Sequence, residues 1–178
     1  TLFFGVPRVW EKISEAMMSK SKNNGCFKSG FIRFAKRIGL SKIRTEEKGN
    51  KSKPFLFGLI NKLVFKKVKA ALGLSDCKYF MTGAAPISEK TLDFFSSLNM
   101  PIMNLYGSSE STGPTTFNHP ESFKIYMNVP NYKHKRICCG KSFEGEHVNL
   151  DPNGQIKCNG RNVFMGYINK REKTEQVF

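Results

Sequence analysis

The stretch from Cys77 to Gly107 constrains the fold of this chain more than any other part of the sequence. It holds two short apolar runs, "CKYFMTGAAP" and "MPIMNLYG", each entering a glycine-containing turn, with the helical pattern "SEKTLDFFSSLN" between them. Two strands joined by a helix of this length predict a βαβ unit, and therefore a parallel sheet with a right-handed crossover. Ser88 is a good N-cap for that helix. The helix is expected to turn three apolar residues inward: Leu92, Phe95 and Leu98.

The first 73 residues predict helices, because apolar residues recur there at helical spacing. Pro7 stands where the first helix can begin, and Gly73 stands where the last can end. Residues 41–54 break the periodicity and are expected to form an exposed loop. Three apolar stripes are expected to face the core: Val9, Ile13, Ala16 and Met17; then Phe27, Phe31, Phe34 and Ile38; then Leu56, Ile60, Val64, Val68 and Leu72.

The pattern after Pro120 returns to strands and turns. "HVNLDPNGQIKCNG" predicts a hairpin that turns on residues 151–154. The expected fold class is therefore α/β, in three parts along the chain: a basic helical segment (1–73), a βαβ segment (74–120) and a small antiparallel β-rich segment (121–178).

The net charge of +15 is concentrated in the helical segment. Residues 1–73 hold 17 Lys and Arg against 4 Asp and Glu, whereas residues 74–178 hold 12 against 10. Such asymmetry indicates an anionic partner: a membrane surface, a polyphosphate ligand or nucleic acid. A solvated helical face explains the same pattern equally well.

The five cysteines favour reduced thiols in a cytosol-facing compartment. Their number is odd and no pair has C-x-x-C spacing, which argues against a zinc site and against a disulfide framework. No apolar run approaches the roughly 18 residues that a membrane span needs. The chain starts with Thr rather than Met and stops at "KTEQVF", so we expect it to be a fragment of a longer protein.

The two glycine turns carry the residues that predict chemistry. In an open parallel sheet, ligands bind at the carboxyl ends of adjacent strands. Small residues around Gly83 permit close approach of a planar ligand. The second turn adds an aromatic ring at Tyr106, hydroxyls at Ser108 and Ser109, and a carboxylate at Glu110. A ring for stacking, hydroxyls for phosphate and an acid for a metal ion indicate a nucleoside triphosphate site.

Four segments, in order, resemble the adenylate-forming (AMP-forming) acyl-CoA synthetases. "YGSSES" is similar to their Y-G-x-[ST]-E motif, and "TGAAPIS" is similar to the upstream adenine-site loop. "FGVPRVWEKI" resembles an entry segment of the long-chain members, and "GRNVFMGYINKREKTE" resembles the stretch before their T-G-D motif. "YGSSESTGP" is most similar to the bubblegum-type long-chain acyl-CoA synthetases. The likeness covers nearly the whole chain and implies a fragment of the large N-terminal domain.

The resemblance implies a two-step ligase reaction. A fatty acid carboxylate attacks the α-phosphate of ATP to give acyl-adenylate and diphosphate, and the CoA thiol then displaces AMP. Tyr106 would stack on adenine, Asn104 would bond its exocyclic amine, Ser109 would contact the α-phosphate and Glu110 would hold Mg²⁺. The residues implied to bind nucleotide are Gly83, Ala84, Ala85, Asn104, Tyr106, Gly107 and Ser109; the implied catalytic residues are Ser109 and Glu110.

Each of these residues also has a structural interpretation. Tyr106 suits a core aromatic at a strand end, Gly83 suits an ordinary turn, and Glu110 suits the first turn of a helix, where the dipole stabilises it. The serines at 108, 109 and 111 suit helix caps, and Asn104 suits hydrogen bonding to nearby backbone.

The family's phosphate loop, T-G-D aspartate and C-terminal catalytic lysine are not in these 178 residues, so the segment alone is expected to be inactive. The parent protein is expected at the cytosolic face of a membrane such as the endoplasmic reticulum, in peripheral contact with anionic lipid. The alternative function is a non-catalytic basic module for anionic lipid or nucleic acid, and a degenerate, inactive synthetase is a third. Nucleic acid is not expected, because the phenylalanine stripe at 27–34 is predicted to face inward.

Overall fold

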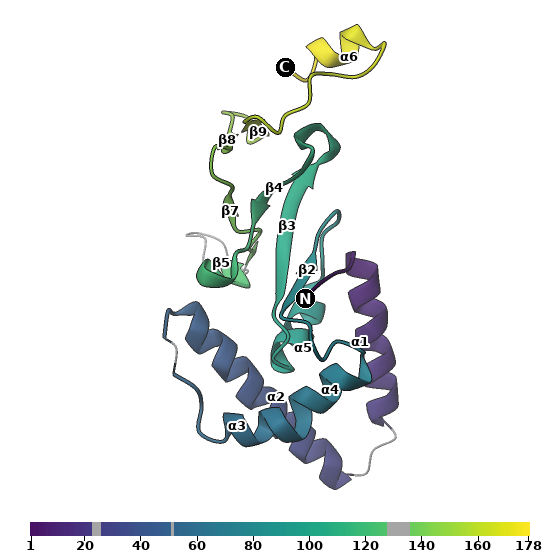
Figure 1. Cartoon of the computed structure of the whole chain (residues 1–178), viewed down its shortest axis with the longest axis vertical. Coiled ribbons are helices and arrows are strands. Elements are labelled where there is room, and N and C mark those ends of the chain that lie inside the picture. Colours follow the sequence, from purple (N-terminus) through teal and green to yellow (C-terminus); the bar gives the residue numbers. More distant parts are fainter. Residues whose placement is uncertain (23–25, 51, 128–135) are drawn as a thin grey trace.

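A five-stranded mixed sheet organises the computed structural model, which describes residues 1–22, 26–50, 52–127 and 136–178. The sheet order is β1-β2-β3-β4-β7 (Figure 1). β1, β2 and β3 are parallel, whereas β4 and β7 continue the sheet in antiparallel pairing. This is the expected α/β class. The strands are β1 (Leu2–Phe4), β2 (Tyr79–Thr82), β3 (Ile102–Ser108), β4 (Gly113–Phe117) and β7 (Lys141–Ser142).

The helices that precede β3 gather around one end of the sheet, and the C-terminal segment, with helix α6 (Arg171–Glu175), lies at the other (Figure 1). The helical elements before β3 are α1 (Pro7–Lys22), α2 (Cys26–Glu47), α3 (Phe57–Ile60), the π-helical η1 (Asn61–Phe65), α4 (Lys66–Ala71) and α5 (Glu89–Ser97). The later elements are η2 (Ser109–Ser111), η3 (Pro120–Ser122), β5 (Tyr126–Met127), β6 (Arg136–Ile137), β8 (His147–Leu150), β9 (Ile156–Asn159) and α6 (Arg171–Glu175).

The predicted βαβ unit is confirmed as β2-α5-β3. The Ser88 hydroxyl accepts a hydrogen bond from the Thr91 backbone N–H at 3.2 Å, which caps α5 as expected. The three apolar residues of α5 are buried: Leu92, Phe95 and Leu98. The predicted hairpin is also confirmed, as β8 paired with β9 around residues 151–155.

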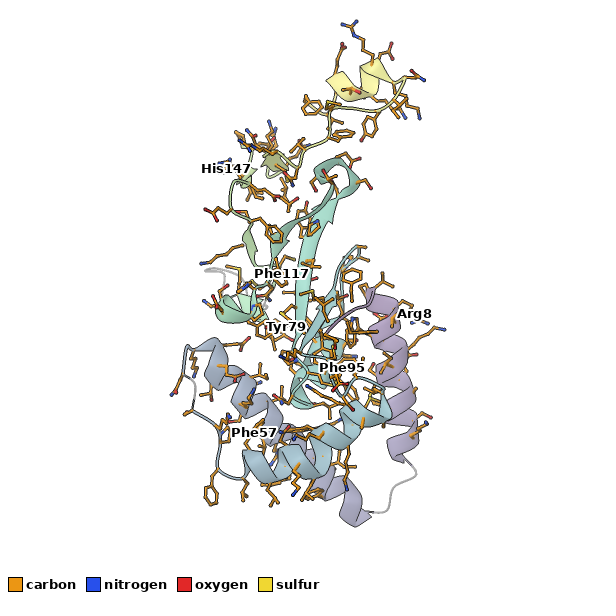
Figure 2. The ribbon with its side chains drawn as sticks, viewed as in Figure 1. Arg8, Phe57, Tyr79, Phe95, Phe117 and His147 are labelled. Atoms are coloured by element: carbon orange, nitrogen blue, oxygen red, sulfur yellow. The ribbon has the colours of Figure 1, made fainter. Side chains whose placement is uncertain are left out.

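Trp10 joins α1 to the sheet at the centre of the core. Its side chain is fully buried, and its indole N–H donates to the carbonyls of Gly5 (3.0 Å) and Met81 (3.2 Å). The indole packs edge-on against Phe95, with ring centroids 4.9 Å apart. Phe95 lies among the side chains where the sheet meets the helices (Figure 2). Pro7, Trp10 and Ser14 are buried on one face of α1. The predicted stripe is only partly right: Ile13 and Met17 are half-buried, but Val9 and Ala16 are exposed.

The described part of the helical segment includes a strand that the periodicity did not predict. Leu2–Phe4 forms β1 and pairs in parallel register with Tyr79–Met81 of β2. The pairing partner lies far along the chain, so three apolar residues give no local sign of it.

Helix α2 continues to Glu47, so the prediction of a loop from residue 41 is wrong. Ile43 is 1% exposed in the core, and a carboxylate oxygen of Glu47 accepts from the Ile125 backbone N–H at 2.6 Å. The polar residues that interrupt the apolar pattern lie on the solvent side of a helix that still packs. The chain leaves the helix before Gly49, whose φ is 78°.

The buried face of α2 also differs from the predicted phenylalanine stripe. Phe31 and Phe34 are exposed by 46% and 44%, whereas Ala35 is fully buried and Ile38 is partly buried; the Phe27 side chain lies outside the described residues. A Cβ on Gly39 would lie 2.2 Å from the Ser97 carbonyl oxygen. Because α2 and α5 approach this closely, small side chains face the core and the phenylalanines turn outward.

The third predicted helix is continuous but changes its winding at η1. Phe57, Ile60 and Phe65 are buried, Val64 is partly buried, and Leu56 is 43% exposed. A π-helical turn holds more residues than an α-helical turn, so the inward face shifts from Val64 to Phe65. The predicted cap at residue 73 is confirmed by a positive φ there.

Candidate functional site

A cleft of about 490 Å³ lies where β2 ends beside the β3–β4 hairpin. Gly83 and Ala84 line one wall, and Tyr106 to Ser109 line another; Phe4 and Thr112–Pro114 also contribute. The parallel register, with Thr82 opposite Asn104, brings the two segments to the same edge of the sheet. The predicted juxtaposition of the two glycine segments is therefore confirmed.

The second glycine segment is a hairpin rather than a strand-to-helix turn. β3 continues through Tyr106 and Gly107 to Ser108, and the chain returns through η2 into β4. The ladder shifts its register between Tyr106 and Gly107. A Cβ on Gly107 would lie 1.9 Å from the Gly113 carbonyl oxygen, so the close pairing of the two strands requires glycine here. Tyr106 is 38% exposed and faces the cleft instead of packing in the core.

The first glycine segment is shaped by close contact with β3. Gly83 is buried, and a Cβ on it would lie 3.2 Å from the Leu105 Cβ. Ala84 has a φ of 69°, in the left-handed region that costs a non-glycine residue roughly 1–2 kcal/mol. Ala85 is exposed and is not among the described residues that line the cleft.

Ser108 and Ser111 cap the turn at η2, whereas Ser108 and Ser109 line the cleft. Ser108 and Ser111 form a reciprocal capping box, in which the Ser111 hydroxyl accepts from the Ser108 backbone N–H at 3.0 Å. The structural interpretation of these two residues is thus confirmed. Ser109 lines the cleft, and within the described residues its hydroxyl has no hydrogen-bond partner.

Glu110 stands at the hairpin tip, one residue beyond the cleft-lining Ser109. Its Oε1 accepts a hydrogen bond from the Tyr167 hydroxyl at 2.6 Å, and its backbone carbonyl accepts from the Phe164 N–H at 2.8 Å. The Tyr167 hydroxyl, the local backbone N–H and the Ser108 hydroxyl together lower the pKa of Glu110. The same bond raises the pKa of Tyr167. Glu110 is therefore an ionised carboxylate, whose oxygens can act as ligands for a metal ion.

Asn104 does not reach the cleft wall formed by the described residues. It is 7% exposed, and its Nδ2 donates to the Cys139 Sγ at 3.2 Å. The Cys139 thiol, whose pKa is raised mainly by burial, lies on the connection between β6 and β7. The amide of Asn104 thus ties β3 to that connection.

Sequence reasoning missed Tyr167 as a site residue. The segment "GRNVFMGYINKREKTE" is similar to a family stretch, but Tyr167 lies 57 residues after Glu110. No spacing rule predicts a contact across so many residues. The only sequence feature that pointed to Tyr167 was its place in the segment that is similar to the family.

The donor set at the tip suits magnesium better than a transition metal. No three His, Cys, Asp or Glu side chains lie together in a metal-binding arrangement in residues 1–22, 26–50, 52–127 and 136–178. Mg²⁺ needs no such cage, because it is commonly held by one or two carboxylates, water and substrate phosphates. The Glu110 carboxylate, next in sequence to the cleft-lining Ser109, is a ligand of the kind that this mode uses.

The described helices include none that combines the length and apolar character of a membrane span.

Comparison with known proteins gives a match to the AMP-binding enzyme family over residues 1–168. The long-chain-fatty-acid–CoA ligase ACSBG2 of Xenopus laevis is 41% identical over 181 residues, covering 99% of this chain and 23% of that protein. The long-chain-fatty-acid–CoA ligase ACSBG1 of Rattus norvegicus is 34% identical over 177 residues, covering 99% of this chain and 24% of that protein. Apo MatB from Rhodopseudomonas palustris has a TM-score of 0.46 at 23% identity, over 66% of this chain and 22% of that chain. The chain thus spans about a quarter of the length of the curated relatives it matches.

Proposed function

Because this chain belongs to the AMP-binding enzyme family, we propose that its parent protein is a long-chain fatty acid–CoA ligase. The parent converts ATP, a fatty acid and CoA into acyl-CoA, AMP and diphosphate through an acyl-adenylate. The similarity to ligases named for this activity supports the substrate class. The observation that carries the proposal is the cleft shared by Gly83, Ala84 and the Tyr106–Ser109 strand.

The cleft is suited to hold adenine between its two walls. Tyr106 offers its ring for stacking, while Gly83 and Ala84 allow the base to approach the backbone. Asn104, tied to Cys139, would reach the exocyclic amine only if its side chain turned away from that thiol. Gly107 keeps the Tyr106 wall close to β4, and Ala85 stands outside the cleft wall.

We infer that Ser109 and Glu110 act on the phosphates. The Ser109 hydroxyl lies at the cleft wall and can donate to the α-phosphate as charge develops during carboxylate attack. Glu110 would hold Mg²⁺, which neutralises phosphate charge when it is bound. The contribution of these residues is positioning, which brings the carboxylate oxygen and the α-phosphorus into line.

Diphosphate exchange in the full-length protein tests this function. Fatty acids from C8 to C24 are supplied with ATP and Mg²⁺, and exchange of labelled diphosphate into ATP is measured. Tyr106→Ala should weaken ATP binding by roughly 5- to 150-fold, since stacking of a base on an aromatic ring contributes about 1–3 kcal/mol. Tyr106→Phe keeps the ring and should bind nearly as well as the wild type. Absence of exchange with every acid in the series would reject the long-chain proposal.

We also propose that the basic helical segment contacts anionic lipid at the cytosolic face of a membrane. Phe55, Leu59 and Leu63 are exposed by 89%, 55% and 43%, and the neighbouring Lys62 and Lys66 are exposed as well. Apolar side chains flanked by lysines suit the boundary between headgroups and acyl chains. Such contact would let long-chain substrate enter from the bilayer.

Liposome flotation of the full-length protein distinguishes lipid from the alternative partner. Binding should rise with phosphatidylserine content and fall in Leu59→Glu, whereas Leu150→Glu, at an exposed site on β8, should change little. Binding that ignores phosphatidylserine contradicts the lipid proposal. Because Phe31 and Phe34 are exposed rather than inward, their orientation no longer disfavours nucleic acid. A salt-dependent mobility shift with RNA or DNA at physiological ionic strength would favour that partner instead.

A further inference from the structure

The segment from residue 160 onward is hydrogen-bonded to the tip of the β3–β4 hairpin. Asn162 Nδ2 donates to the Ser111 carbonyl at 3.0 Å, and the Thr112 hydroxyl donates to the Asn162 carbonyl. The Phe164 N–H donates to the Glu110 carbonyl at 2.8 Å. Three consecutive residues of the tip are therefore bonded to a segment about 50 residues later in the chain. The tip cannot move relative to that segment without breaking these bonds.

Tyr167 is itself held rigidly within this segment. Its backbone N–H donates to the Thr174 hydroxyl at 2.9 Å, and that hydroxyl donates to the Lys170 carbonyl at 3.1 Å. The Tyr167 ring lies edge-on against Phe164, with centroids 4.8 Å apart. Next to it, Gly166 has a φ of 139°, and a Cβ there would lie 2.5 Å from the Thr174 Cγ2. The phenol direction is thus set by backbone bonds and ring packing.

The Tyr167 hydroxyl bonds to the carboxylate of Glu110, the only acidic side chain at the described hairpin tip. The Tyr167 hydroxyl donates to Glu110 Oε1 at 2.6 Å, a short bond of the kind that a hydroxyl makes to a charged carboxylate. A glutamate side chain has three rotatable bonds, and bonding one carboxylate oxygen restricts them. Bonds of this kind to a metal-binding carboxylate orient its remaining oxygen.

We propose that Tyr167 is a positioning residue that aims the free oxygen of Glu110 at a divalent cation on the nucleotide phosphates. This inference rests on the proposed function, since it requires that Glu110 serve a magnesium–ATP complex. Tyr167 touches neither cation nor nucleotide, and it acts through Glu110 alone.

Equilibrium binding of ATP to the full-length protein, measured by calorimetry across a series of MgCl₂ concentrations, tests the inference. Tyr167→Phe keeps the ring against Phe164 and removes only the hydroxyl. We expect it to raise the half-saturating magnesium concentration by roughly tenfold, the lower end of the usual effect of losing such a supporting partner. Its melting temperature should stay close to that of the wild type. Tyr79→Phe is the matched control, because Tyr79 is an exposed tyrosine at the start of β2 and should leave the magnesium dependence unchanged.

A second variant separates positioning from general loosening of the tip. Glu110→Gln removes the charge but leaves an oxygen that Tyr167 can bond, and it should itself raise the magnesium requirement. Adding Tyr167→Phe to it should cause no further rise, because the phenol acts only through the carboxylate. A further rise in the double variant, or an unchanged requirement in Tyr167→Phe, overturns the inference while leaving the ligase proposal intact. A wild-type protein that binds no ATP at any magnesium concentration overturns both.

Discussion

Replacing Gly107 by alanine tests whether the cleft depends on the close pairing of β3 and β4. The new Cβ would lie 1.9 Å from the Gly113 carbonyl oxygen and 2.7 Å from the Pro114 Cα, both backbone atoms. No side-chain rotation relieves such a clash, so the strands must separate by about 1.5 Å to reach normal contact distances. The pairings of Gly107 with Pro114 and of Ser108 with Gly113 would be lost. We expect a destabilisation of about 3 kcal/mol, the upper part of the usual range for overpacking.

Calorimetric unfolding of the full-length protein measures this effect. A loss of about 3 kcal/mol corresponds to a fall in Tm of at most roughly 6–12 °C, the shift for a domain of about 150–250 residues, because the larger unfolding entropy of a longer chain reduces the shift. ATP binding should weaken as well, because the displaced strand carries Tyr106 and Ser109. Gly58→Ala is the control: a Cβ added there would meet nothing within 4 Å, and alanine should stabilise α3 by up to about 1 kcal/mol. A Gly107→Ala protein with the same Tm and the same ATP affinity as the wild type would refute the reasoning.

Three further predictions concern single groups. Ser88→Ala should lower the stability by about 1 kcal/mol in thermal unfolding, because it removes the N-cap of α5. Ala84→Gly should raise the Tm, since relief of the left-handed strain exceeds the entropy of the added glycine by about 0.5–1 kcal/mol. The hydrogen bond from Tyr167 lowers the pKa of Glu110 and so stabilises the folded state fully at pH values above the ordinary pKa of a glutamate. This stabilisation is lost as the pH falls through the lowered pKa of the folded state. Carbon-13 NMR of the carboxyl group should therefore show the pKa of Glu110 rising in Tyr167→Phe; an unchanged value would contradict the assigned cause.

Local patterns predicted the elements whose signals are local. The cap of α5 at Ser88, the β8–β9 turn at residues 151–154 and the fold class all follow from residues a few positions apart. The placing of Gly83 beside Tyr106 was also predictable, because parallel strands joined by one helix end at the same edge.

The errors arose where a distant partner decides the outcome. The polar sequence at the end of α2 predicts a loop, but Glu47 there accepts a hydrogen bond from the distant Ile125 N–H. The spacing of Phe31 predicts an inward side chain, but the close approach of α5 to Gly39 leaves room only for small residues on that face. Likewise, the contact of Tyr167 with Glu110 depends on where a later segment returns to the hairpin.

The indole of Trp10 sets an order of events during synthesis. Its N–H donates to the Met81 carbonyl, 71 residues later in the chain. At about 5–20 residues per second, the ribosome needs roughly 4–14 s to make that stretch. Until then the indole lacks its contacts with Met81, Phe80 and Phe95, so α1 completes its packing on the sheet only after β2 and α5 have been made.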